Sequence, residues 1–112
     1  MKAIEWRTKA EADAADAALW FARQGGLVLG RRFLAELEAT LQRIAVFPGS
    51  GSTRHADLAA QLPVPLPLPL RFMLVPGFER YLVYYLDRSD RVDIMRVWCV
   101  DRGLDALTQD IS

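Results

Sequence analysis

Residues 80–98 read RYLVYYLDRSDRVDIMRVW, and this stretch decides much of the predicted fold. Two apolar runs rich in Val, Ile, Leu and Tyr flank a polar tetrapeptide at residues 87–90, a pattern that indicates a β-hairpin. In YLVYYL both alternating sets of side chains are apolar, which is typical of a central strand covered on both faces. The sequence therefore predicts strands over residues 80–86 and 91–98 in the middle of a sheet.

Two helices are predicted before this hairpin. Residues 3–7 can form a short opening strand, after which Thr8 and Glu11 have the spacing of a capping box with Thr8 as N-cap. The two glycines at residues 25–26 should end the first helix. The apolar side chains that recur along one helical face are Ala12, Ala15, Leu19 and Ala22, with Ala18 beside them.

The second helix is predicted over residues 27–47. Phe33, Leu37, Leu41 and Ile44 recur at spacings of three and four, and the Pro-Gly pair at residues 48–49 should stop the helix. Two consecutive helices joined by a two-glycine break favour an antiparallel helical hairpin.

Residues 49–69 form an irregular connector with four prolines near its end. A polyproline ligand for an adaptor domain is one interpretation; a stiff surface connector with buried Val and Leu side chains is the one we favour. A strand over residues 70–75, a Pro-Gly turn and a short C-terminal helix complete the chain. We therefore expect a single α+β domain over residues 1–112, ordered β-α-α-β-β-β(-α), with the helical hairpin packed on a small, mostly antiparallel sheet.

The composition argues against several classes of protein, although neutrality still allows a local basic patch. The chain carries 14 basic and 14 acidic residues, for a formal net charge of zero, whereas proteins that mainly bind phosphate backbones usually have a basic excess. A single cysteine, Cys99, excludes an internal disulfide and a cysteine-rich metal site, and no cofactor or metal is expected. There is no signal-peptide core and no apolar run of membrane-spanning length, so we expect a cytoplasmic protein without a membrane partner.

Standard catalytic motifs are missing from the sequence. It contains no P-loop, GxGxxG, HExxH or GxSxG pattern. The only histidine, His55, lies in a Gly/Ser/Arg-rich loop and is expected to be a solvated polar residue. Cys99 lies near a strand end, with no histidine close to it in sequence, and is expected to be a buried structural thiol.

Four arginines in or beside the predicted strands are the main candidates for function. Guanidinium groups dominate phosphate and carboxylate recognition, and the interleaved aromatic residues could stack on bases. The structural alternative is that the arginines form ion pairs with nearby acidic residues and that the aromatic residues belong to the core. The arginines are Arg71, Arg80, Arg96 and Arg102.

Three segments, in order and over nearly the whole chain, resemble the ParE/RelE superfamily of toxins from bacterial type II toxin–antitoxin pairs. They are RFLAELEATLQRIAVFPGSG, PLRFMLVPGFERYLVYYLD and VDIMRVWCVDRGLDAL. The resemblance implies the strand and helix order given above. It also implies one of two activities: RelE-like members cut messenger RNA in the ribosome, and ParE-like members poison DNA gyrase.

Within this resemblance, the ParE-like branch is favoured. The chain is neutral and has only two lysines, whereas ribosome-dependent nucleases of this fold are typically strongly basic. Tyr81 stands where the nuclease branch tends to have a catalytic arginine. Cys99 stands where many members have histidine, and Gly103 replaces an acidic residue, so one nuclease position lacks a general base.

The resemblance thus predicts a ParE-like toxin that inhibits DNA gyrase by protein–protein contact. A cognate ParD-like antitoxin would neutralise it, and operator DNA would be bound only indirectly, through the antitoxin. No catalytic residue is expected, and the partner-binding candidates are Arg71, Arg80, Arg96, Trp98 and Arg102. In the alternative, a RelE-type mRNA endonuclease, the catalytic residues would be Arg71, Arg80, Tyr81, Arg96 and Arg102. A third alternative is a non-toxic homologue that only binds its antitoxin.

Overall fold

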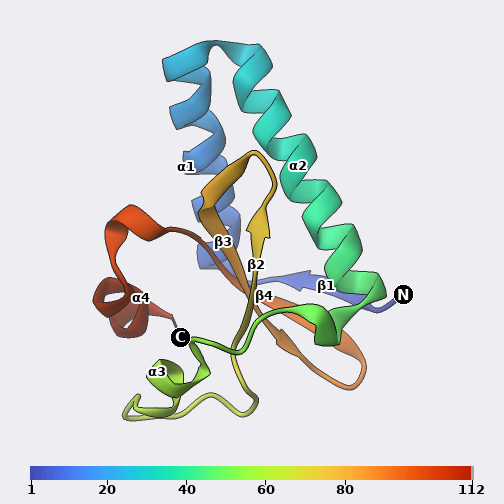
Figure 1. Ribbon diagram of the computed structural model, residues 1–112, viewed down its shortest axis with the longest axis vertical. Helices are drawn as coiled ribbons and strands as arrows, with labels where there is room; N and C mark the ends of the chain where they lie inside the picture. Colours follow the sequence, from blue (N-terminus) through green and yellow to red (C-terminus); the bar gives the residue numbers. More distant parts are fainter. Residues whose placement is uncertain (112) are drawn as a thin grey trace.

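The computed structural model describes residues 1–111 and places a helical hairpin against one face of a four-stranded sheet (Figure 1). The predicted α+β order is confirmed, including the C-terminal helix. In chain order the elements are β1 (Ala3–Trp6), α1 (Thr8–Gly25), α2 (Leu27–Val46), the 3₁₀ turn η1 (Pro48–Ser50), α3 (Ala56–Ala60), β2 (Arg71–Val75), β3 (Phe78–Asp87), β4 (Arg91–Cys99), the 3₁₀ turn η2 (Val100–Arg102) and α4 (Leu104–Asp110).

The strand order in the sheet is β1-β4-β3-β2. Only β1 runs parallel to its neighbour, β4, so the sheet is mostly antiparallel, as predicted. In the central pair, Tyr84 stands opposite Arg96 and Tyr85 opposite Ile94, which leaves Met95 as an extra residue in β4. An extra residue of this kind bends the strand and increases its local twist.

The face of the sheet that carries the helical hairpin holds the larger part of the core. Phe33, Leu37 and Ile44 of α2 are buried against Val83 and Tyr85 of β3. The spacing of apolar residues in α2 therefore predicted its buried face correctly, and α2 ends at Val46, one residue earlier than expected.

The first helix buries a different face from the one predicted. Its buried residues are Ala10, Ala14 and Ala17, whereas Ala12 and Ala15 of the predicted face are exposed. The alanines of this helix form two rows, each with helical spacing. The buried row, Ala10, Ala14 and Ala17, continues to Phe21, whose ring buries far more apolar area than an alanine, so this face packs on the sheet. Thr8 is the first residue of α1 and makes no capping hydrogen bond, so its prediction as N-cap was wrong.

Two glycines allow the sharp turn and the close contact between the helices. Gly26 adopts a φ of +88°, a conformation that side chains disfavour, and it separates α1 from α2. At Gly30 a Cβ atom would lie 2.8 Å from the Ala18 carbonyl oxygen and 3.1 Å from the Ala22 Cβ. The two helices therefore approach each other to a distance that a larger residue at Gly30 would prevent.

The other face of the sheet is covered by the connector, α3 and α4 (Figure 1). Leu62, Leu66 and Leu68 of the connector pack against this second core, so the prediction of a connector with buried side chains is confirmed for these leucines. It was wrong for Val64, which is 81% exposed. The buried residues of this second core are Ala59, Leu70, Leu82, Tyr84, Leu86, Met95, Trp98, Leu107 and Ile111. β3 is therefore apolar and covered on both faces, as its sequence predicted.

Candidate functional site

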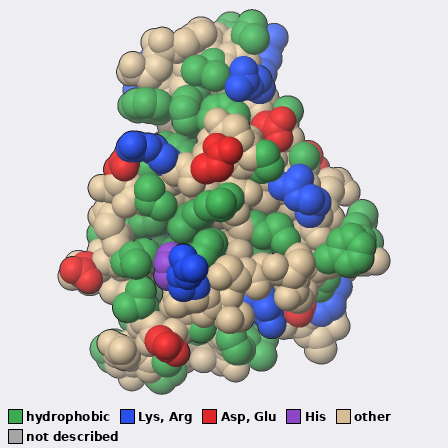
Figure 2. Space-filling view, in the orientation of Figure 1, with side chains coloured by type: hydrophobic (Ala, Val, Ile, Leu, Met, Phe, Trp, Pro, Cys, Tyr) green, Lys and Arg blue, Asp and Glu red, His purple; other side chains and the backbone are tan. Residues whose placement is uncertain are grey.

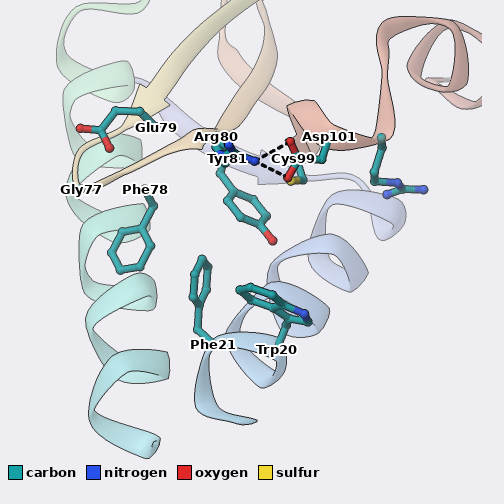
Figure 3. Close-up of a pocket in the computed structure, with 10 residues that line it drawn as sticks. Trp20, Phe21, Gly77, Phe78, Glu79, Arg80, Tyr81, Cys99 and Asp101 are labelled. Carbon is teal, nitrogen blue, oxygen red and sulfur yellow. Dashed lines mark hydrogen bonds and ion pairs between the residues drawn. The ribbon is translucent and has the colours of Figure 1, made fainter. Parts of the chain in front are cut away.

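A groove of about 740 Å³ lies between α1, the start of β3 and the end of β4 (Figure 3). Gly77 of the β2–β3 turn and Asp101 and Arg102 of η2 contribute to its lining. Trp20, Phe21, Gly77, Phe78, Glu79, Arg80, Tyr81, Cys99, Asp101 and Arg102 line it. The groove thus brings together three of the sequence-predicted candidates: Arg80, Tyr81 and Arg102.

An aromatic cluster centred on Phe21 forms the floor of the groove. The ring centroid of Phe21 lies 4.8 Å from Phe78, 5.1 Å from Phe33 and 5.5 Å from Tyr81. Rings at these separations stabilise one another beyond the area that they bury. Trp20 packs edge-on at 5.1 Å from Phe21 but remains 51% exposed, so the apolar floor continues into solvent.

Charged side chains form the rim. Arg80 donates two hydrogen bonds to the Asp101 carboxylate, at 2.8 and 2.9 Å, and both side chains are well exposed. Arg102 is half exposed, and its guanidinium carbon lies 3.9 Å from the centroid of the Trp98 ring, a cation–π arrangement. Because exposed ion pairs contribute little to stability, these groups can exchange partners at low cost.

Tyr81 stands opposite Cys99 in the β3–β4 pairing. Burial, and then the neighbouring Cys99 thiol, raise the pKa of Tyr81 above its ordinary value, so its hydroxyl stays protonated at neutral pH. Cys99 itself is only partly buried and contributes to the wall of the groove. The expectation of a fully buried structural thiol was therefore wrong.

Arg96, by contrast, is an internal structural residue. It is 3% exposed and donates hydrogen bonds of 2.7 and 2.8 Å to the two carboxylate oxygens of Asp13 on α1. It also reaches α4, where it donates to the Asp110 carbonyl oxygen at 2.8 Å. The hydrogen bonds from Arg96 to Asp13 are the main reason why the pKa of the Arg96 guanidinium is raised above its ordinary value. Arg96 therefore ties α1, β4 and α4 together, and its prediction as a partner-binding surface residue was wrong.

Trp98 and Arg71 also have structural positions. Trp98 is fully buried in the second core and donates from its indole nitrogen to the Gly103 carbonyl oxygen at 3.2 Å. Its prediction as a partner-binding residue was therefore wrong as well, because a buried side chain cannot contact a partner. Arg71 donates to the carbonyl oxygens of Gly49 and Gly51, both at 3.1 Å, and so fixes the chain that leaves α2. It lies outside the groove.

His55 is not the solvated residue that its loop sequence suggested. Its Nδ1 lies 2.7 Å from the Tyr84 hydroxyl, and its ring stacks on Phe72 with a centroid separation of 4.6 Å. Burial, and then the charge of Arg54, lower the pKa of His55, so the ring is neutral at pH 7. Burial raises the pKa of Tyr84 to about 12. His55 therefore joins the loop before α3 to the second core.

Sequence reasoning missed the helical contribution to the groove. Trp20 and Phe21 of α1, with Phe78 of β3, were not among the candidates, yet all three line the groove. One signal was available: adjacent aromatic residues on a helix point about 100° apart, so Trp20 and Phe21 cannot both face the same core.

No group of three or more His, Cys, Asp or Glu side chains that could hold a metal ion is present among residues 1–111. Within the same residues, no helix is long and apolar enough to cross a membrane.

Comparisons with known proteins agree with this fold. A family model described as the ParE toxin of type II toxin–antitoxin system, parDE, matches residues 4–102. Among solved structures, one described as the chromosomal ParDE TA system from P. aeruginosa has a TM-score of 0.62 and 14% sequence identity. The match covers 88% of this chain and 96% of that chain, and at this identity it indicates a shared fold. No curated protein sequence matches this chain at a significant level.

Proposed function

Because the chain belongs to the ParE toxin family of type II toxin–antitoxin systems, we propose that it inhibits DNA gyrase by protein–protein contact through the aromatic groove. The toxin contributes no chemical step in this mechanism. It binds the enzyme, and gyrase itself carries out the DNA cleavage that becomes damaging. The proposal predicts that the side chains at the groove decide affinity for gyrase.

The composition of the groove carries the proposal. Residues that dominate the energetics of protein interfaces are Trp, Tyr and Arg, placed around well-packed apolar centres. Trp20 and Tyr81 stand on a floor built by Phe21 and Phe78, with Arg80 at the rim. Rigid rings lose little conformational entropy on binding, and the rim arginine can exchange its intramolecular carboxylate for one of the partner.

The positions of the arginines favour this mechanism over ribosome-dependent RNA cleavage. A phosphate transition state requires charged donors that face the substrate. Arg96 instead faces Asp13 and Asp110 inside the protein, and Arg71 donates to backbone carbonyl oxygens. Arg80 and Arg102 remain as exposed cations, and Tyr81 lines the same groove.

The antitoxin is the second expected partner. We propose that a cognate ParD-like antitoxin neutralises the toxin by laying an amphipathic segment, a helix or a strand, over the hairpin and the adjoining end of the sheet. Such a segment would bury the exposed Trp20 indole and occlude the groove. In this arrangement gyrase and antitoxin compete for the same side chains.

A supercoiling assay with purified gyrase tests the proposal. Relaxed plasmid, ATP and increasing toxin should give loss of supercoiled product and accumulation of cleaved DNA, and stoichiometric antitoxin should reverse both effects. A parallel translation reaction monitors messenger RNA cleavage in the ribosomal A site. Unchanged supercoiling together with cleaved messages would replace the proposal with the nuclease alternative. Unchanged supercoiling with intact messages would leave a homologue that only binds its antitoxin.

A further inference from the structure

One arginine of the groove is already occupied by a carboxylate of the toxin itself. Nη1 of Arg80, on β3, donates to both carboxylate oxygens of Asp101, on η2, at 2.8 and 2.9 Å. Figure 3 shows this pair at the groove, beside Tyr81 and Cys99. Charge-assisted hydrogen bonds between a guanidinium and a carboxylate are also the contacts with which arginine binds an acidic partner. Asp101 therefore fills, in the free toxin, a position that a partner carboxylate needs.

The contact between Arg80 and Asp101 is easily replaced. The two side chains are 73% and 58% exposed, and an ion pair in water contributes little to stability. Both hydrogen bonds come from Nη1. A bidentate contact, in which two nitrogens of the guanidinium each donate to one oxygen, is stronger than this. A partner carboxylate that takes two donors would therefore bind Arg80 better than Asp101 does.

Arg102 is a second guanidinium in the lining of the groove, and an aromatic ring holds it in place. Its guanidinium carbon lies 3.9 Å from the ring centroid of Trp98, which is buried and fixed by its own hydrogen bond to Gly103. Within residues 1–111 its one ion pair is with Asp13, at 3.8 Å, and Asp13 already accepts two hydrogen bonds from Arg96. A cation–π contact positions the charge and leaves the N–H donors for another group. Arg102 is therefore preorganised to bind an anion beside η2.

The charge balance around the groove favours a protein carboxylate over a nucleic-acid backbone. The lining carries two arginines and two acids, Asp101 and Glu79, so it has no net charge. A phosphate backbone presents a row of charges and requires several cations in line. Figure 2 shows acidic side chains interspersed with basic ones on the face that it presents. The groove is therefore suited to one or two carboxylates next to an apolar side chain.

We propose that Asp101 is an internal competitor for the groove, and that the segment of gyrase bound there is acidic. On binding, a carboxylate of this segment displaces Asp101 from Arg80, and a neighbouring carboxylate contacts Arg102. An apolar side chain between the two lies on the rings of Trp20 and Phe21. The inference rests on the proposed function, because it names the chemistry of the segment that the groove recognises. It assigns affinity to the arginines and restraint of that affinity to Asp101.

Substitution of Asp101 by asparagine separates a competitor from a merely structural pair. Asp101→Asn keeps the size of the side chain and removes the competing charge. The toxin concentration needed for half-inhibition of supercoiling should therefore fall about two- to fivefold, the size of an exposed ion pair. The matched control is Asp90→Asn, because Asp90 pairs with Arg91 at 3.3 Å outside the groove, and it should leave half-inhibition unchanged. Circular dichroism verifies that both variants are folded.

A double-mutant cycle tests whether Asp101 acts through Arg80. Arg80→Gln should weaken inhibition about tenfold, as should Arg102→Gln, since each removes a charged hydrogen bond to the partner. In the Arg80→Gln background, Asp101→Asn should lose most of its gain, because the guanidinium that it releases is absent.

A peptide titration without gyrase keeps this inference separate from the proposed function. The probes are two capped peptides, Glu-Phe-Glu and its neutral counterpart Gln-Phe-Gln, added to the ¹⁵N-labelled full chain. The acidic probe should bind about tenfold more tightly than the neutral one and shift the Nε–H signals of Arg80 and Arg102. It should bind about two- to fivefold more tightly still to the Asp101→Asn variant. Binding of the acidic probe together with unchanged supercoiling would overturn the gyrase proposal and leave the carboxylate site standing.

Three results would overturn the inference. One is an Asp101→Asn variant that acts no more strongly than the unmodified chain on a gyrase that the unmodified chain inhibits. Another is an equal gain from Asp101→Asn with and without Arg80, since Asp101 would then act by general repulsion. The third is equal affinity for the two probes, or binding of a short single-stranded RNA through Arg80 and Arg102 when the acidic probe does not bind.

Discussion

Replacing Asp13 by alanine removes the acceptor that holds the centre of the structure together. The side chain of Asp13 is 8% exposed and accepts two hydrogen bonds from Arg96, at 2.7 and 2.8 Å. It also accepts the backbone N–H of Val97 at 3.1 Å, on the edge of β4 that β1 is too short to cover. The variant therefore leaves a buried guanidinium with only Asp110 as carboxylate partner, together with an unpaired buried N–H.

The cost follows from these contacts. Removal of one partner from a buried ion pair typically destabilises a protein by about 3–5 kcal/mol, because the other charge stays uncompensated. The substitution also leaves the Val97 N–H without its acceptor, so a loss in the upper half of that range is expected. Since the free energy of unfolding of a domain of this size is about 5–15 kcal/mol, the loss is a large part of its stability. It corresponds to a fall in Tm of roughly 10–20 °C.

Urea unfolding followed by circular dichroism and tryptophan fluorescence measures this loss. Asp16→Ala is the matched control, because Asp16 is an exposed aspartate one turn further along α1 and should change stability by less than about 0.5 kcal/mol. In a double-mutant cycle, Asp13→Ala should cost much less when Arg96 is already alanine. If Asp13→Ala costs no more than Asp16→Ala, the reasoning that Arg96 and Asp13 hold α1, β4 and α4 together is refuted.

Three further predictions concern other polar contacts. Tyr85→Phe removes the hydroxyl that accepts the Gly51 N–H at 3.0 Å, so chemical denaturation should reveal a loss of about 1–3 kcal/mol; an unchanged midpoint would contradict this contact. Burial and Arg54 lower the pKa of His55, so the unfolded chain binds more protons and stability should fall as pH drops below about 6.5. His55→Gln should flatten the pH dependence of the free energy of unfolding between about pH 7.5 and 5. If stability declines in parallel in the variant and the unmodified chain, His55 is not the group responsible. Burial alone would raise the pKa of Asp93, but hydrogen bonds from two arginines outweigh it and lower that pKa. The ionised Asp93 therefore stabilises the fold above about pH 4, and this stabilisation is lost in stronger acid. Asp93→Asn should unfold more easily at neutral pH and should show a shallower acid transition. An acid transition equal to that of the unmodified chain would refute the stabilising role of Asp93.

The fold was largely predictable because the spacing of apolar residues is unambiguous in α2 and in the two central strands. The strands of the central hairpin, the buried face of α2 and the glycine break between the helices each follow from local sequence. The face of α1 was not predictable in this way. Its alanines satisfy the helical period in two phases, and only packing of Phe21 against Phe78 and Phe33 decides between them.

The site was less predictable, because exposure of an arginine depends on partners that are distant in sequence. Arg96 pairs with an aspartate 83 residues away, and no local pattern indicates this contact. Arg80 pairs across the strand end with Asp101, so the alternative of ion pairing with nearby acidic residues describes this arginine. The groove also depends on Trp20 and Phe21, which approach Tyr81 only when α1 packs across the sheet.

The most direct test of the central claim compares gyrase inhibition by variants of two exposed aromatic residues. Trp20 is 51% exposed at the groove, and Phe47 is 67% exposed at the end of α2, outside it. If the groove contacts gyrase, Trp20→Ala should raise the toxin concentration needed for half-inhibition of supercoiling by about tenfold or more, as expected for an interface hot spot, and Phe47→Ala should leave it unchanged. Equal inhibition by the two folded variants would contradict the account.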